Sequence, residues 1–238
     1  CARWRRTKEK AANFPKSSAN AHTMLRLTIA LALWSSYFCL ARASGAASDK
    51  ELTCNSALKI THVSSGYHLS SAEINWGSGS GQQSVTATIS PGDTSSMWII
   101  GMADGKDTCL AGSPIMCGDT VRMTHLLTGK NLHSHGFRSP LTGQQEVSAF
   151  GENGAGDSGD NWKIVCPSGM GKPWKTDKPF YLLHLDTGKY LTSSKDSRFT
   201  QQNCPNCPII GQLEVVASGS MKDAGRWVVQ RGVFIAED

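Results

Sequence analysis

Short runs of alternating apolar and polar residues dominate the chain after residue 45. In the first of them, Leu58 and Ile60 alternate with Lys59 and Thr61, which is the period of two expected of a strand with one buried face. Gly-rich and Ser-rich turns separate the runs, and no stretch after residue 45 shows a convincing helical period. The pattern therefore predicts an all-β domain made of many short strands.

The same landmarks recur three times and in the same order. Each unit contains a histidine four residues before a glycine, then a Gly-Gln or equivalent turn before a valine strand, and finally a tryptophan. The histidines are His62, His125 and His184, and the tryptophans are Trp98, Trp162 and Trp227. The tryptophans lie 64 and 65 residues apart. This agreement in order and spacing indicates three internal repeats.

Each repeat accommodates about four strands, so about twelve are expected. Closing twelve strands with threefold symmetry gives a β-trefoil, a six-stranded barrel capped by three hairpins, and closure removes exposed strand edges. Three units are too few for a propeller, and a sandwich gives no reason for the triple landmark. We expect the domain at 54–235, with repeats at about 54–107, 117–172 and 178–232, and the three tryptophans in a shared core.

The first part of the chain differs in composition from the rest. Residues 1–43 hold eight of the 24 Lys and Arg residues but only one of the 19 acidic residues. The remaining 195 residues therefore carry 16 basic and 18 acidic side chains, a net charge of −2. This balance argues against nucleic acid as the main partner, because such binding needs a basic surface.

Residues 24–43 have the features of a secretory signal peptide. A short basic start precedes an apolar run over residues 27–40, and Ala41-Arg42-Ala43 supplies small residues at a cleavage site. An uncleaved anchor is the main alternative, although the run is short for a bilayer span. Residues 1–23 are expected to be an upstream or disordered extension and 44–53 a short lead. No other segment approaches membrane-spanning length.

The cysteines behind this segment predict disulfides, because their number is even and a signal peptide implies an oxidising compartment. They are Cys54, Cys109, Cys117, Cys166, Cys204 and Cys207. Cys109 and Cys117 flank a loop rich in Gly and Pro, and they are the pair we favour. A disulfide between Cys54 and Cys166 is inferred only by elimination. Cys204 and Cys207 lie in a Pro-containing insertion, where a local disulfide or pairing elsewhere is favoured over redox activity.

No arrangement of residues points to catalysis or to a metal. Recurrence in every repeat gives the three turn histidines a structural role. His133 and His135 share one strand face without a further metal ligand nearby in sequence, which favours a polar surface edge. The Gly-rich acidic segment 151–160 lacks the spacing of a calcium loop and is expected to be a mobile hairpin loop. We expect no enzyme activity, no metal and no cofactor.

The loops at 73–82 and 133–144 are candidates for protein binding. They are rich in Gly and Ser and carry apolar and Arg side chains, which dominate interface hot spots. The candidate residues are Ile74, Trp76, Phe137, Arg138 and Leu141. The alternative, that these side chains fold back onto the barrel, has equal weight at this point.

Three segments, 77–85, 121–133 and 145–151, resemble the stromal cell-derived factor 2 family. Its members are built from MIR motifs, which also occur in protein O-mannosyltransferases and in inositol trisphosphate and ryanodine receptors. The resemblance extends over about residues 51–235 and is densest in the first two repeats. It implies a β-trefoil, residence in the endoplasmic reticulum, and no catalytic residues.

The resemblance also implies partners: a J-domain co-chaperone, the chaperone BiP and unfolded secretory clients. A lectin-like module for mannose-type glycans is the alternative, although only Trp76 and Phe137 are candidate sugar-stacking aromatics. Members of the family end in a retrieval tetrapeptide, whereas this chain ends at Asp238. We expect a fragment that lacks its last residues, with secretion or retention through a partner as alternatives.

Overall fold

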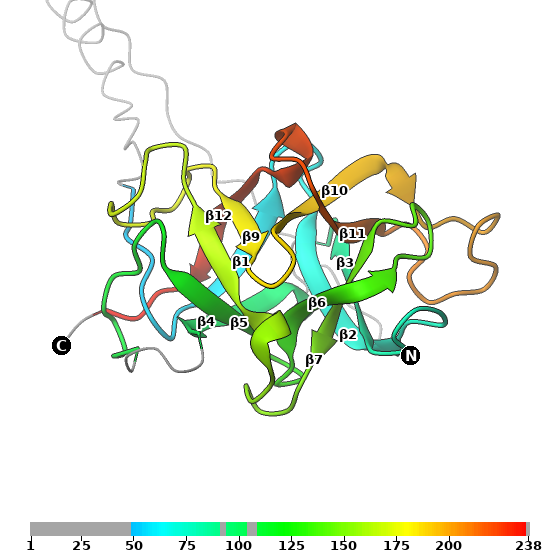
Figure 1. Cartoon of the computed structure of the whole chain (residues 1–238), viewed down its shortest axis with the longest axis horizontal. Coiled ribbons are helices and arrows are strands. Elements are labelled where there is room, and N and C mark those ends of the chain that lie inside the picture. The colour runs from blue at the N-terminus through cyan, green and yellow to red at the C-terminus, as the bar shows by residue number, and fades with distance from the viewer. Residues whose placement is uncertain (1–48, 91–93, 104–108, 237–238) are drawn as a thin grey trace, which may run out of the picture. The chain divides into compact units, whose positions relative to one another are not determined.

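The computed structural model describes residues 49–90, 94–103 and 109–236 (Figure 1). These residues form twelve strands and three short 3-10 helices. Within these ranges, no helix has the length and hydropathy needed to cross a bilayer. The all-β prediction is confirmed. The predicted signal peptide and upstream extension lie outside the described residues.

Six strands form a ring. They are β1 (Ala57–His62), β4 (Met97–Met102), β5 (Thr120–His125), β8 (Trp162–Val165), β9 (Tyr181–His184) and β12 (Trp227–Val233). β1 pairs with β12 and β4, β5 pairs with β4 and β8, and β8 pairs with β9. A bridge between Phe180 and Trp227 joins the β9 side to β12 and closes the ring. All these pairings are antiparallel, as expected when short connections join successive strands.

The other six strands form three hairpins that extend from the ring. They are β2 (His68–Asn75) with β3 (Gln83–Thr88), β6 (Asn131–Arg138) with β7 (Gln145–Phe150), and β10 (Lys189–Arg198) with β11 (Leu213–Ser218). β3, β7 and β11 also pair with one another. The hairpins therefore meet at one end of the ring, and the fold is β-trefoil-like.

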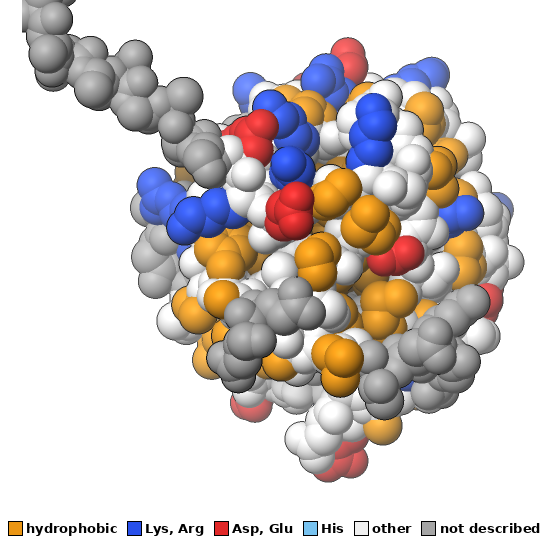
Figure 2. Space-filling model, turned by 90° about the vertical axis from the view of Figure 1, so that its left-hand side faces the viewer, with side chains coloured by type: hydrophobic (Ala, Val, Ile, Leu, Met, Phe, Trp, Pro, Cys, Tyr) orange, Lys and Arg blue, Asp and Glu red, His pale blue; other side chains and the backbone are white. Residues whose placement is uncertain are grey.

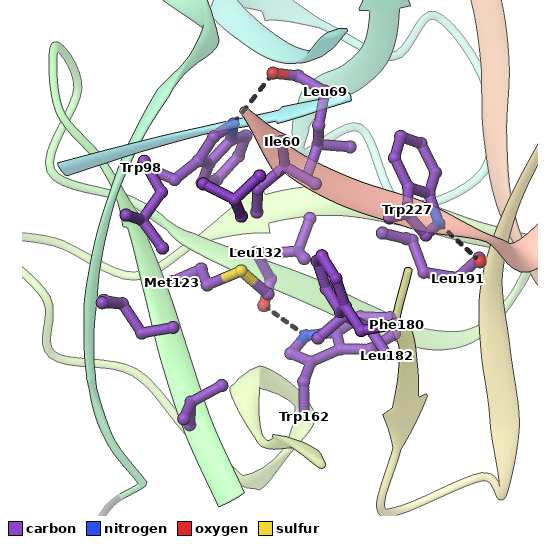
Figure 3. Packing of buried hydrophobic residues seen from close by; sticks show 14 of the residues in the cluster. Ile60, Leu69, Trp98, Met123, Leu132, Trp162, Phe180, Leu182, Leu191 and Trp227 are labelled. Carbon is purple, nitrogen blue, oxygen red and sulfur yellow. Dashed lines mark hydrogen bonds between the residues drawn. The ribbon is translucent and has the colours of Figure 1, made fainter. Parts of the chain in front are cut away.

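Trp98, Trp162 and Trp227 lie fully buried in one hydrophobic core (Figure 3). Each indole Nε1 donates a hydrogen bond to the backbone oxygen of a leucine that precedes it in the chain. The pairs are Trp98 with Leu69 at 3.0 Å, Trp162 with Leu132 at 2.9 Å and Trp227 with Leu191 at 2.9 Å. The large apolar rings are thus buried without leaving their polar atom unpaired, which would be costly.

Each turn histidine is also fully buried and packs against one of these indoles. In the first repeat, His62 Nδ1 lies 2.8 Å from the Ser65 hydroxyl and Nε2 lies 3.0 Å from the Ala224 carbonyl oxygen. His125 and His184 make the same two kinds of contact. The carbonyl oxygens belong to the short 3-10 helices. Each histidine therefore joins its turn to the helix that precedes the tryptophan it packs against. The structural role predicted for these residues is confirmed.

The disulfide prediction is wrong in its pairing. Cys109 bonds to Cys54, and Cys117 bonds to Cys166, both with Cα atoms 5.7 Å apart. The reason is that the segment between Cys109 and Cys117 does not close on itself. After a turn over residues 110–113, Pro114 forms a backbone bridge with Thr53 and Met116 forms one with Pro173. Each cysteine therefore faces a different neighbour, and the pairing of Cys54 with Cys166 is also wrong.

Candidate functional site

The predicted protein-binding residues do not form one exposed surface. Phe137 is 48% exposed and Arg138 is also exposed. Trp76, in contrast, is only 6% exposed, and Ile74 and Leu141 are partly buried against the same small cluster. The prediction that all five are available for binding is therefore wrong for Trp76 and in part for Ile74 and Leu141. Their side chains fold back, as in the alternative, but into this small cluster and not into the barrel core.

The insertion between β10 and β11 covers these side chains. Phe199 and Ile209 from this insertion form the second hydrophobic cluster with Trp76, whose ring centroid lies 6.0 Å from that of Phe199. The indole Nε1 of Trp76 donates to the Val147 backbone oxygen at 3.1 Å. A local Cys204–Cys207 disulfide lies against the cluster. Sequence spacing gave no indication that the third repeat would cover the loop of the first.

Two buried glutamates hold the two loops that carry the candidate binding residues. Glu214 is 1% exposed, and its carboxylate accepts hydrogen bonds from the backbone N–H groups of Leu141 and Thr142 at 2.7 and 3.1 Å. Glu146 is fully buried and accepts from the hydroxyl and the backbone N–H of Ser80. Each glutamate lies in one hairpin and orders the loop of another. The loops therefore present a defined surface.

A row of rings follows one face of β6, from the barrel toward the hairpin end. His133 lies with its ring centroid 4.8 Å from that of His135, and His135 lies 4.7 Å from Phe137. Alternation along a strand places these residues on one side. Exposure increases along the row, from 3% at His133 to 48% at Phe137. The expected polar surface edge is thus wrong for His133, which is buried.

Asp160 explains why His133 is buried. The Nδ1 atom of His133 lies 2.9 Å from the Asp160 carboxylate. The same carboxylate accepts from the backbone N–H of Asp157 at 2.9 Å, and Asp157 caps the short helix over Ser158–Asp160. The Asp-x-x-Asp spacing indicates such a cap from sequence. Its contact with His133, 27 residues away, has no local sequence signal.

His133, Asp157 and Asp160 offer ligand atoms within 4.8 Å of one another, a grouping that could hold a metal ion. In this arrangement Asp160 already completes the capping box as its third helical residue and is the partner of His133. Asn131 Nδ2 donates to its carboxylate as well, at 3.1 Å. Hydrogen bonds within the fold therefore explain why these three side chains lie close together, without a metal ion.

A polar cavity of about 340 Å³ lies beside the row. Its lining includes His133, His135, Asp157, Ser158, Asp186 and Thr187. Burial lowers the pKa of His135, with the neighbouring His133 acting in the same direction and Glu146 opposing it. His135 is therefore mainly neutral near pH 7. A cavity lined by carboxylates, hydroxyls and imidazoles is chemically suited to a ligand rich in hydroxyl groups.

No protein-family model matches the sequence. Individual relatives do match. The bovine stromal cell-derived factor 2-like protein 1 is 42% identical over 185 residues, covering 77% of this chain and 78% of the relative.

Solved structures agree with this relationship. The crystal structure of the SDF2-like protein from Arabidopsis thaliana has 36% sequence identity and a TM-score of 0.73, and the match covers 79% of this chain and 99% of the other. A protein O-mannosyltransferase complex from S. cerevisiae, bound to its sugar donor, matches with 26% identity and a TM-score of 0.65. That match covers 77% of this chain but only 26% of the enzyme chain. The 42% identity to the bovine protein extends over most of both chains. The chain therefore belongs to the stromal cell-derived factor 2 family.

Proposed function

We propose that this chain is a non-catalytic β-trefoil of three MIR repeats in the lumen of the endoplasmic reticulum. It assists the folding and quality control of secretory proteins in complex with a J-domain co-chaperone and BiP. The family relationship and the disulfides support this compartment, since disulfides persist where the environment is oxidising. The repeated histidine and tryptophan contacts support the division into three repeats.

The observation that carries the proposal is the exposure of Phe137 beside Arg138 at the end of the β6–β7 hairpin. An aromatic side chain next to an arginine is a frequent hot spot of protein interfaces. The backbone of the following loop is fixed by Glu214, so little conformational entropy is lost when a partner binds. The J-domain protein docks at this hairpin.

A double replacement, Phe137→Ala with Arg138→Ala, tests the site. Capture of the J-domain partner from an oxidised lumenal extract should fall at least tenfold, while the midpoint of thermal unfolding stays nearly unchanged because both side chains are exposed. Met221→Ala with Lys222→Ala is the matched control, because it removes an exposed apolar and an exposed basic side chain from another loop. Intact capture by the Phe137 variant, or equal losses in both variants, would refute the proposed docking site.

The polar cavity beside β6 favours a second candidate, a lectin-like function toward mannose-type glycans. Its carboxylates and hydroxyls could bind sugar hydroxyl groups, and Phe137 supplies an exposed ring nearby. Asp186→Asn alters the cavity, and its side chain lies outside the hydrophobic core. Binding to a mannose glycan array that is lost in this variant, in the absence of any chaperone partner, would favour the lectin function.

A further inference from the structure

A second cavity lies far from β6 in the sequence, at the connection between β8 and β9. Its volume is about 400 Å³, within the usual range of ligand sites. The walls are mainly apolar and include Trp174, Pro173, Pro179 and the Cys117–Cys166 disulfide. Proline rings and a disulfide change shape little, so the cavity is largely preformed.

Trp174 is held rigidly in this wall. Its backbone N–H donates to the Ile115 oxygen at 2.8 Å, and its own carbonyl oxygen accepts from Leu52 at 2.8 Å. The ring packs edge-on against Phe180, with centroids 4.7 Å apart. The side chain is only 1% exposed, and its indole N–H has no hydrogen-bond partner among the described residues. This contrasts with Trp98, whose indole is paired, and buried donors in native proteins are rarely left unpaired.

Basic side chains surround the mouth of the cavity, and no acidic side chain lines it. The basic residues are Lys172, Lys175, Lys178 and Arg226. In Figure 2, which faces the side of the molecule where the β8–β9 connection lies, Lys and Arg side chains gather beside a hydrophobic area. Lys172 is exposed and forms no ion pair with the described residues. Arg226 pairs with Asp223 at 3.5 Å. The site therefore combines an apolar floor with a basic rim, on which Lys172 is the cation without a carboxylate partner among the described residues.

The chain itself shows what kind of segment this rim accepts. Asp49 lies with its carboxylate 2.8 Å from the ammonium of Lys178, and Glu51 lies 3.7 Å from that of Lys175. Glu51 and Lys175 also form an antiparallel backbone bridge. An extended segment with carboxylates at alternate positions thus already lies along one side of the cavity mouth. The exposed Lys172 leaves a positive charge available for a second acidic segment.

We propose that this cavity is a docking site for an acidic peptide segment of a partner protein. Its carboxylates pair with Lys172 and compete with the exposed Asp49 and Asp223 for Lys178 and Arg226. One apolar side chain enters the cavity beside Pro173, Pro179 and the Cys117–Cys166 disulfide, which lie next to Trp174. Charge complementarity selects the segment, and the apolar wall supplies contact area that exposed ion pairs alone lack. This inference rests on the β8–β9 connection and is independent of the proposed docking at Phe137.

Fluorescence anisotropy with a labelled twelve-residue peptide tests the proposal. The peptide carries four glutamates around one leucine and one phenylalanine, and a second peptide has lysines in place of the glutamates. We expect binding of the acidic peptide only, weaker at high salt because exposed ion pairs are screened. The variant Lys172→Glu with Lys178→Glu should weaken binding at least tenfold. Lys195→Glu with Lys222→Glu reverses the same number of charges at exposed lysines outside the cavity lining and is the control for net charge.

An NMR spectrum of the indole N–H groups locates the bound peptide. The cross-peak that is missing in Trp174→Phe should shift on addition of the acidic peptide, whereas that of the buried Trp98 should not. Four results would overturn the proposal: equal binding of both peptides, affinity insensitive to Lys172 and Lys178, an unmoved Trp174 cross-peak, or binding of phosphatidylserine vesicles without binding of the peptide.

Discussion

The barrel and the hairpin ends differ in how closely the three repeats that we propose agree with one another. In the barrel, three equivalent sets of contacts join a tryptophan, its leucine acceptor and a turn histidine. At the hairpin ends, the first repeat buries Trp76, the second exposes Phe137 and the third carries a disulfide-containing insertion. Packing of a shared core thus keeps the repeats alike, whereas their outer ends vary. Recognition is expected where they vary, because such loops change at little cost to the fold.

Removing a barrel tryptophan should give the largest effect on the free energy of unfolding. Trp98→Ala, Trp162→Ala and Trp227→Ala should each lower it by about 3–5 kcal/mol, because each leaves a large cavity in the core. For a domain stable by roughly 5–15 kcal/mol, this is a severe loss. Urea unfolding of the three variants measures it. A mild effect at two of the three positions would contradict the equivalence of the repeats.

Removing the disulfides should distinguish the barrel from the insertion. Cys117 and Cys166 are separated by 49 residues, whereas Cys204 and Cys207 are separated by 3. The loop-closure relation assigns about 4 kcal/mol to the first crosslink and about 2 kcal/mol to the second. Serine replacement of each pair, followed by urea unfolding, tests the difference. Equal losses for both pairs would show that loop length does not govern their contributions.

Acidification should produce a smaller effect through the turn histidines. Burial lowers the pKa of His62 and of His184, while their backbone hydrogen bonds oppose the shift in part. Between the lowered value and about 6.5, the unfolded chain carries more protons than the folded one. The free energy of unfolding should therefore decrease as the pH falls through this window.

Thermal unfolding at pH 7.5 and pH 5.5 measures this dependence. We expect a lower midpoint at pH 5.5, and a smaller difference between the two pH values in a variant with His62→Gln and His184→Gln. A midpoint that rises on acidification would contradict the assignment of these histidines as buried neutral groups.

The candidate site was less predictable than the barrel. The sequence identified Phe137 and Arg138, which are exposed, but it placed Trp76 on the same surface, although the insertion around Phe199 covers it. The sequence pointed to His133 as a candidate, but it did not indicate that Asp160 is the hydrogen-bond partner of this histidine. The sequence did not indicate the cavity at Trp174. Its walls come from several separate segments, each either apolar or basic, and these segments share no motif.

The sequence by itself determined the all-β fold, the repeated histidine and tryptophan positions and the family. These follow from period-two patterns and from landmarks repeated three times, and both can be identified within a short window of residues. Only the tertiary structure decided that Cys109 bonds to Cys54, that Cys117 bonds to Cys166, and which side chains each hairpin end exposes. The physical reason is that these outcomes depend on contacts between segments distant in sequence, where side-chain packing and backbone bridges leave no periodic pattern.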